Sequence, residues 1–166
     1  SYLMDPAADL GLGLDVYGVR YPDEAIAALR GHGARYRGWL PNARVPEVFA
    51  RHMMTVHVPR RFYVERLPGI PTIRMFEAMA CGIPLLCAPW SDSEALFRPW
   101  QDYLPARGPA EMQQHMRALQ ADAGLRRSLA THGLQTIAER HTCSHRVDKL
   151  LAIIDTLNHA PRMAAA

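Results

Sequence analysis

A single acidic residue, Glu77, stands in the part of this sequence best suited to chemistry. The stretch 72–80 has the pattern of a short helix between a glycine-proline loop and an apolar strand. At about 100° per residue, Ile73, Phe76 and Ala80 share one face of that helix, and Glu77 lies at the margin of this face. Because burying an unpaired charge is unfavourable, a carboxylate there needs a polar partner. We therefore predict that Glu77 binds a ligand or pairs with a cation.

The residues before this helix suit the binding of an anion. The turn Gly69-Ile70-Pro71-Thr72 leads into a helix N-terminus, where free N–H groups and the helix dipole attract negative charge. Arginine side chains bind phosphate oxygens two at a time. Four arginines flank the turn: Arg60, Arg61, Arg66 and Arg74. A carboxylate nearby can accept hydrogen bonds from two ribose hydroxyls, so the segment predicts a site for a nucleotide with a diphosphate.

Composition excludes several other classes of protein. The chain has 166 residues, 49% of them hydrophobic and 21% charged, which fits one folded domain. The net charge is +3, and no arginine run alternates with aromatic residues, so we expect no nucleic-acid partner. No apolar run approaches the roughly 20 residues that cross a bilayer, and no signal-peptide pattern opens the chain. The three cysteines lack C-x-x-C spacing. We expect reduced thiols and a cytoplasmic protein without an integral membrane segment.

The apolar pattern alternates between short strands and helices. Strands are expected at 14–17, 34–38, 55–58, 84–88 and 102–105. Helices are expected at 22–30, 45–52, 72–80 and 93–97, and over most of 109–157 with breaks near 123, 133 and 141, whereas 60–71 is expected to be a loop. This order predicts an α/β, Rossmann-like parallel sheet with helices on both faces and a helical C-terminal tail.

Domain limits follow from the same pattern. Residues 1–13 are expected to be a linker or chain end, 14–157 a nucleotide-binding, Rossmann-like domain and 158–166 a disordered tail. In a parallel sheet the ligand lies beyond the carboxyl ends of the strands, here near Arg20, Gly38, Arg60 and Trp90. The apolar stripes of the tail helices are predicted to be core: Leu125, Leu129, Leu134, Ile137, Leu150, Leu151 and Ile154.

Three segments resemble a known family. Residues 77–84 read E-A-M-A-C-G-I-P, similar to the E-A-M-A-C-G-x-P core of the donor-binding motif in group 1 glycosyltransferases. Residues 36–40 resemble the glycine loop of that family, and 140–146 resemble the closing H-T-x-x-x-R of its spore-maturation-protein-like subgroup. The resemblance covers 14–157. It implies the carboxy-terminal, donor-binding half of a GT-B enzyme of the retaining type, which has two Rossmann-like domains around a cleft.

The resemblance also implies roles for particular residues. Glu77 would hold the ribose, and the turn Gly69-Ile70-Pro71-Thr72 would offer backbone donors to the diphosphate or the sugar. Gly38, Trp39 and Leu40 would flank the base. Arg20 and one of Arg60 and Arg61 are the candidates for the basic pair that grips the phosphates, with Arg74 beside them.

The sequence departs from the family at two places, the basic pair just described and an acidic residue. A second glutamate usually stands eight residues before the one equivalent to Glu77, where it contacts the transferred sugar, but here that residue is Gly69. Glu65 is an alternative through a rearranged loop, and no catalytic residue is assigned. The chain has no Asp-x-Asp pair, so we expect no metal or other cofactor. His141, Cys143 and His145 are too close together, without a distant partner, to make a good metal site.

These observations predict the donor-binding domain of a hexosyltransferase-type glycosyltransferase that moves a sugar from a nucleotide-sugar to an unassigned acceptor. The opposing N-terminal, acceptor-binding domain would be missing, so the chain alone is expected to bind nucleotide and be inactive. The alternative is a catalytically silent sugar-nucleotide-binding or partner-binding module with the same fold. For Glu77 itself, the simplest alternative is an exposed pair with Arg74 on its own helix. A non-sugar Rossmann enzyme is disfavoured because no G-x-G-x-x-G follows the first strand.

Overall fold

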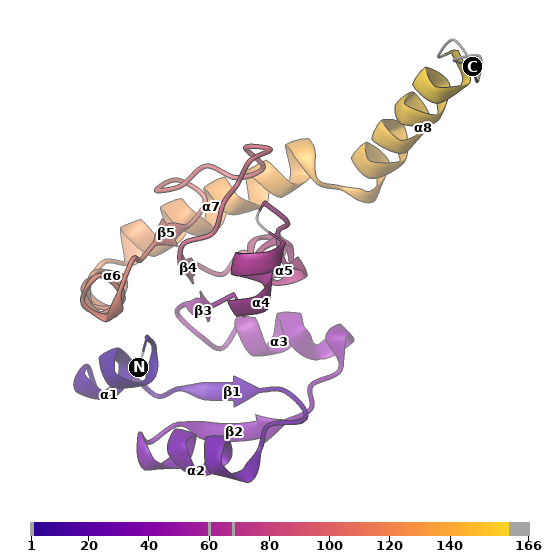
Figure 1. Cartoon of the computed structure of the whole chain (residues 1–166). Helices are drawn as coiled ribbons and strands as arrows, with labels where there is room; N and C mark the ends of the chain where they lie inside the picture. Colours follow the sequence, from indigo (N-terminus) through magenta and orange to yellow (C-terminus); the bar gives the residue numbers. More distant parts are fainter. Residues whose placement is uncertain (1, 60, 68, 160–166) are drawn as a thin grey trace.

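Within the part of the chain that the structure describes, the strands pair only in parallel. The computed structural model describes residues 2–59, 61–67 and 69–159 (Figure 1). Strands β1 (Asp15–Tyr17) and β2 (Arg35–Gly38) form one sheet. Strands β3 (Thr55–His57), β4 (Leu85–Cys87) and β5 (Leu104–Pro105) form a second sheet in that order. Together with helices on both sides, these parallel sheets confirm the predicted α/β, Rossmann-like class. All five predicted strands are present, each within about two residues of the expected limits.

Helices connect the strands and continue after the last one. In chain order they are α1 (Met4–Asp9), α2 (Asp23–Gly31), the 3-10 turn η1 (Asn42–Arg44), α3 (Val45–Phe49), α4 (Arg61–Arg66), α5 (Ile73–Ala80), α6 (Pro109–Ala121), α7 (Ala123–Arg140) and α8 (Cys143–His159). Figure 1 shows α2 beside β2, α6 and α7 at the end of the molecule beyond β4 and β5, and α8 extending away from the body.

The core is built on both faces of β4. Leu85 and Cys87 point into a cluster with α5, whereas Leu86 points into a cluster with α6 and α7. All three side chains are at most 1% exposed. A strand covered on both faces needs a continuous apolar run instead of an alternating one, which is why Leu-Leu-Cys occurs here. Burial raises the pKa of Cys87 to about 12, so this thiol is an inert core side chain.

Helix α5 buries a different face from the predicted one. Met75, Ala78 and Met79 are each 1% exposed, whereas Ile73 is 65% exposed and Ala80 is also on the outside. The predicted face was wrong because both sides of this short helix are apolar, and the longer methionine side chains fill the space against β4 and α7. Phe76 is half-buried against the same cluster.

Three other expectations about elements were wrong. Residues 4–9 of the predicted linker form α1, whose Ala7 is buried against α6, and Arg61–Arg66 of the predicted 60–71 loop form α4. Residues 93–97 are not helical, because the side chain of Asp92 accepts the N–H groups of Leu96 and Phe97, each at 2.9 Å, and so takes the place of a helical carbonyl.

The C-terminal helices also differ from expectation. Helix α7 does not break at Gly133. A Cβ there would lie 3.2 Å from Met79 Cγ, so the glycine allows α7 to pack closely against α5. Leu129 is buried, but Leu134 and, in α8, Leu150, Leu151 and Ile154 are 43–58% exposed. The predicted core stripe of α8 is thus uncovered in this chain. Helix α8 reaches His159, and the rest of the predicted tail, 160–166, lies outside the described residues.

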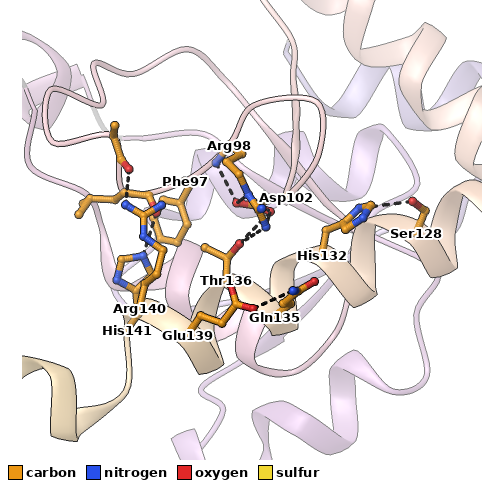
Figure 2. A network of polar contacts seen from close by, with 12 residues as sticks. Phe97, Arg98, Asp102, Ser128, His132, Gln135, Thr136, Glu139, Arg140 and His141 are labelled. Atoms are coloured by element: carbon orange, nitrogen blue, oxygen red, sulfur yellow. Dashed lines mark hydrogen bonds and ion pairs between the residues drawn. The ribbon is translucent and has the colours of Figure 1, made fainter.

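A buried carboxylate fixes the connection between β4 and β5, residues 88–103, which we call the β4–β5 loop. The side chain of Asp102 is 0% exposed. It accepts hydrogen bonds from Arg98 N at 2.8 Å, Arg98 Nη2 at 3.0 Å and Thr136 Oγ1 at 3.0 Å (Figure 2). Arg98 Nη2 also donates to Thr136 Oγ1 at 2.6 Å. Since Thr136 belongs to α7, the loop is tied to that helix through Asp102.

We predict that Asp102→Ala lowers the free energy of unfolding by about 2–4 kcal/mol, because a backbone N–H and a buried hydroxyl lose their acceptor. Urea denaturation of the purified chain measures this quantity. The matched control is Glu139→Ala on α7, whose carboxylate accepts from Gln135 at an exposed position. The control should change the free energy by less than about 0.5 kcal/mol. Equal effects of the two substitutions would contradict the structural role of Asp102.

Candidate functional site

The carboxyl ends of β3 and β4 meet the start of α5 around an open hollow. It is bordered by residues of several elements: His57 at the end of β3, Val64 of α4, Leu67, Gly69, Ile70 and Thr72 before α5, and Trp90 and Ser91 of the β4–β5 loop. We call this feature the α5 hollow. Its empty space, including the open mouth, is about 320 Å³. The enclosed cavity is only about 20 Å³, so a nucleotide-sized ligand would lie across the open mouth of the hollow and not inside it.

The first turn of α5 has no side-chain cap. Thr72 stands at the N-cap position with extended backbone, yet its hydroxyl makes no capping bond. The hydroxyl lies 2.9 Å from His57 Nε2 instead. The first N–H groups of α5 are therefore open to an incoming anion at the mouth of the hollow.

His57 is a site residue that sequence reasoning missed. Burial, together with the positive charge of Arg74, lowers the pKa of His57, so the ring is neutral at neutral pH. A neutral imidazole beside a hydroxyl can donate or accept one hydrogen bond without bringing a charge. Its position near the end of the predicted strand 55–58, at the edge where ligands bind, was the available signal.

Gly69 is required by the backbone. Its φ is +86°, a conformation that other residues rarely adopt, and a Cβ there would lie 2.5 Å from Ser93 Oγ. The turn before α5 therefore passes close to the β4–β5 loop. A glutamate at this position would be strained, which gives a physical reason for the absence of the second acidic residue.

Glu77 pairs with Arg74 in the structure. Glu77 Oε2 lies 2.5 Å from Arg74 Nη1, and the two side chains are 22% and 58% exposed. The pair with Arg74 that was predicted as the alternative for Glu77 is thus present, between residues one helical turn apart. The negative charge of Glu77, added to burial, raises the pKa of Cys81 on the next turn. The role of Glu77 toward a ligand stays a prediction.

The other predicted site residues follow the first two strands. Gly38 has φ +71°, Trp39 is 73% exposed and Leu40 is half-buried. Arg20 is exposed and has φ +61°, which is unusual for a residue other than glycine. The ends of β1 and β2 lie side by side, since Gly18 N donates to Gly38 O at 2.8 Å.

The predicted arginines are only partly placed. Arg74 is on the first turn of α5, and Arg66 is exposed at the end of α4. Arg60 lies outside the described residues, and so does the side chain of Arg61. Of the predicted residues, Gly69, Ile70 and Thr72 thus border the α5 hollow, whereas Arg74 and Glu77 lie on α5 without lining it.

A second, wider hollow lies along β1 and β2, between these strands and residues 48–54, with an empty space of about 1190 Å³ that includes open solvent. Its most buried charge is Asp15, which contacts Arg35 Nε at 2.7 Å, Arg37 Nε at 2.9 Å and His52 Nε2 at 3.1 Å. Hydrogen bonds from these three side chains, above all Arg35, hold the pKa of Asp15 far below its usual range. Sequence reasoning missed this cluster, although Asp15 and Arg35 are direct partners in the β1–β2 register.

Within the described residues, no three His, Cys, Asp or Glu side chains are grouped so that they could hold a metal ion. Across 2–59, 61–67 and 69–159, no helix is both long and apolar enough to cross a membrane.

Comparison with known proteins now adds to this geometry. A family model described as glycosyl transferase-like matches residues 1–152. The chain belongs to this family. None of the curated protein sequences matches the chain. The family match includes α1, the segment expected to be a linker, and every residue at the α5 hollow.

Solved structures of similar fold include HepE from Anabaena, in complex with UDP, with a TM-score of 0.75 and 14% identity. The match covers 93% of this chain and 44% of HepE. Sucrose-phosphate synthase from Thermosynechococcus elongatus has the same TM-score and identity, with 93% of this chain and 41% of that enzyme covered. These likenesses confirm the Rossmann-like α/β fold. The chain spans less than half the length of these structural relatives.

We predict that Gly69→Ala destabilises the chain by about 1–2 kcal/mol, because a Cβ at φ +86° is strained and meets Ser93. The matched control is Gly31→Ala at the end of α2, where φ is ordinary and no atom lies within 4 Å of the added Cβ. This control should be neutral or stabilising by up to about 1 kcal/mol. Thermal and urea unfolding of both variants measure the difference, and an unchanged stability of Gly69→Ala would contradict the tight passage of the turn.

Proposed function

We propose that the protein is the carboxy-terminal, donor-binding half of a retaining, hexosyltransferase-type glycosyltransferase of the spore-maturation-protein-like subgroup. The observation that carries the proposal is the uncapped start of α5 at the hollow, followed by Arg74 and Glu77 on the same helix. A nucleoside diphosphate sugar presents an anion and a vicinal diol, which match these groups.

The diphosphate takes the start of α5 in this proposal. The N–H groups of the first turn and the helix dipole attract its charge, and Arg74 donates from the side. The sugar lies toward the hollow, where the Thr72 hydroxyl and the neutral His57 ring offer hydrogen bonds without a competing charge. In transfer, these fixed dipoles stabilise the leaving diphosphate.

Exchange of the Arg74–Glu77 pair makes room for the ligand. An exposed pair one turn apart is worth only about 0.2–0.5 kcal/mol, so breaking it opposes binding very little. Arg74 then turns to phosphate, and the Glu77 carboxylate accepts hydrogen bonds from the ribose. Gly38, Trp39 and Leu40 flank the base, and Arg20 with Arg60 or Arg61 adds positive charge.

The structural relatives support a uridine diphosphate sugar as the donor class. HepE is also solved with UDP-glucose, and a pneumococcal O-GlcNAc transferase, GtfA, is solved with UDP and GlcNAc. We extend this ligand class to the present chain as part of the proposal. The free cysteines are consistent with a protein that acts in the reducing cytoplasm, where we place the enzyme.

An opposing N-terminal domain completes the proposed enzyme. Helix α8 has no buried residue, and one of its faces is apolar and uncovered, with side chains 45–69% exposed: Val147, Leu150, Leu151, Ile154 and Leu157. Such a stripe at i, i+3, i+4 and i+7 spacing is typical of a helix that packs against another element. The relatives are more than twice as long as the matched region, so we propose that the missing acceptor-binding domain covers this face. The chain alone then binds donor without transferring sugar.

A silent binding module is the second candidate. It is favoured by Gly69, because its positive φ excludes the acidic residue that group 1 enzymes place against the transferred sugar. Turnover by a protein that contains both domains, abolished by Glu77→Ala, would favour the enzyme. Binding of a nucleotide-sugar without any turnover would favour the module.

Calorimetric titration of the chain with UDP, GDP, ADP and dTDP tests the proposal. We expect saturable binding of one diphosphate, weakened about tenfold or more, about 1.4 kcal/mol, in Glu77→Ala. The matched control is Glu24→Ala, an exposed glutamate in the first turn of α2, which should bind as the wild type does. Equal affinities of wild type and Glu77→Ala would contradict the role of Glu77.

A further inference from the structure

The junction of α7 and α8 is hydrogen-bonded to the β4–β5 loop. We call residues 140–146 the elbow. Arg140 Nη2 donates to Ala95 O at 2.7 Å, and His141 Nε2 lies 2.8 Å from Leu96 O (Figure 2). Arg146 Nη2 lies 2.7 Å from His141 Nδ1 and donates to Arg140 O at 2.9 Å. The elbow is thus closed on itself and attached to the loop through the Arg140 guanidinium and the His141 ring.

Only one protonation state of His141 satisfies these contacts. A backbone carbonyl can only accept, so Nε2 must carry the proton toward Leu96 O. A guanidinium can only donate, so Nδ1 must offer its lone pair to Arg146. The ring is therefore neutral and in the Nε2–H form. A second proton on Nδ1 would face an arginine N–H at 2.7 Å.

The same ring packs on the helix that carries Glu77. The centroids of His141 and Phe76 are 5.3 Å apart with perpendicular planes, and those of His141 and Phe97 are 5.1 Å apart. Phe76 and Phe97 contact each other edge-on at 4.9 Å. His141 therefore joins three elements: the elbow, the β4–β5 loop that borders the α5 hollow, and α5 itself, one residue before Glu77.

We propose that His141 is a positioning residue for the donor site: its neutral Nε2–H form holds α5 and the β4–β5 loop against the elbow, and its protonation releases them. The inference rests on the proposed function and adds a pH-dependent control to it. Helix α8 begins within the elbow, so release also frees the helix whose apolar face we assign to the missing domain.

The charges around the ring favour the neutral form. Burial is the main cause that lowers the pKa of His141, with the positive charges of Arg146, Arg140 and His145 adding to it. The contribution of the neutral ring is therefore complete above the ordinary histidine pKa and is lost as the pH falls through the lowered value. Several acidic groups of these elements have partners of their own: Asp92 with the Leu96 and Phe97 N–H groups, Glu94 with Lys149, Asp102 with Arg98, Glu139 with Gln135, and Glu77 with Arg74.

Titration with UDP-glucose at about pH 7.5 and about pH 5.5 tests the proposal in binding. His141→Gln keeps a donor at the reach of Nε2 but loses the acceptor for Arg146, and His141→Asn does the reverse. We expect wild-type affinity to fall about fivefold or more on acidification. Both variants should bind about fivefold more weakly than the wild type at the higher pH and lose most of the pH response.

The matched control is His132→Gln on α7, the helix that precedes the elbow. Its ring Nδ1 lies 3.4 Å from Ser128 Oγ at an exposed position, away from the elbow (Figure 2). This variant should keep the wild-type affinity and pH response, including any part that comes from His57. Wild-type affinity and pH response in both His141 variants would overturn the proposal.

Nitrogen-15 NMR of the imidazole rings gives a readout that needs no nucleotide. We expect His141 to show an unprotonated Nδ1 and a protonated Nε2 at neutral pH. On acidification, the amide signals of Phe76 and Phe97 should move in the wild type and stay in His141→Gln. A freely titrating His141 with mixed protonation would overturn the inference. If neither the wild type nor any variant binds UDP-glucose but the NMR result is as expected, the proposed ligand is wrong and the coupling of His141 to α5 is supported.

Discussion

The need to satisfy one buried charge, that of Asp102, organises the half of the molecule that contains the candidate site. Its carboxylate is wholly buried and is satisfied by Arg98 and by Thr136 of α7. The donors would be left unsatisfied if the loop moved away from α7. The Asp102 contacts therefore hold the β4–β5 loop in one position on that helix. The loop in turn carries Trp90 and Ser91 to the α5 hollow and brings Ser93 against Gly69.

The candidate site therefore combines rigidly packed surroundings with the open N-terminus of a helix. Helix α5 is fixed on one face by Met75 and Met79, which are buried between β4 and α7. Phe76 fixes it further by packing against Phe97 of the β4–β5 loop. What stays open is the first turn of α5, together with the exposed Arg74–Glu77 pair. Rigid surroundings and a weakly held polar pair favour ligand binding, because little has to be reordered when the ligand arrives.

The strands and most helices could be predicted because they depend on local apolar patterns and on turn residues near their ends. The face of α5 could not, since Ile73 and Met75 are equally apolar and only the contact with α7 selects between them. The absence of a helix at 93–97 depends on the side chain of Asp92, and the Asp102 contact spans 34 residues to Thr136. For the candidate site, the motif located Glu77 and the turn before α5, but His57 became visible only when β3 and α5 were brought together.

Chemical-shift mapping by two-dimensional NMR, with UDP added to the nitrogen-15-labelled chain, tests the central claim most directly. The account predicts that the largest shifts fall on residues 69–77, His57 and Ser91, around the start of α5. The charged groups of the other hollow, Asp15, Arg35 and His52, serve as the internal comparison. Shifts concentrated there, or a spectrum that does not change at saturating UDP, would contradict the assignment of the donor site to α5.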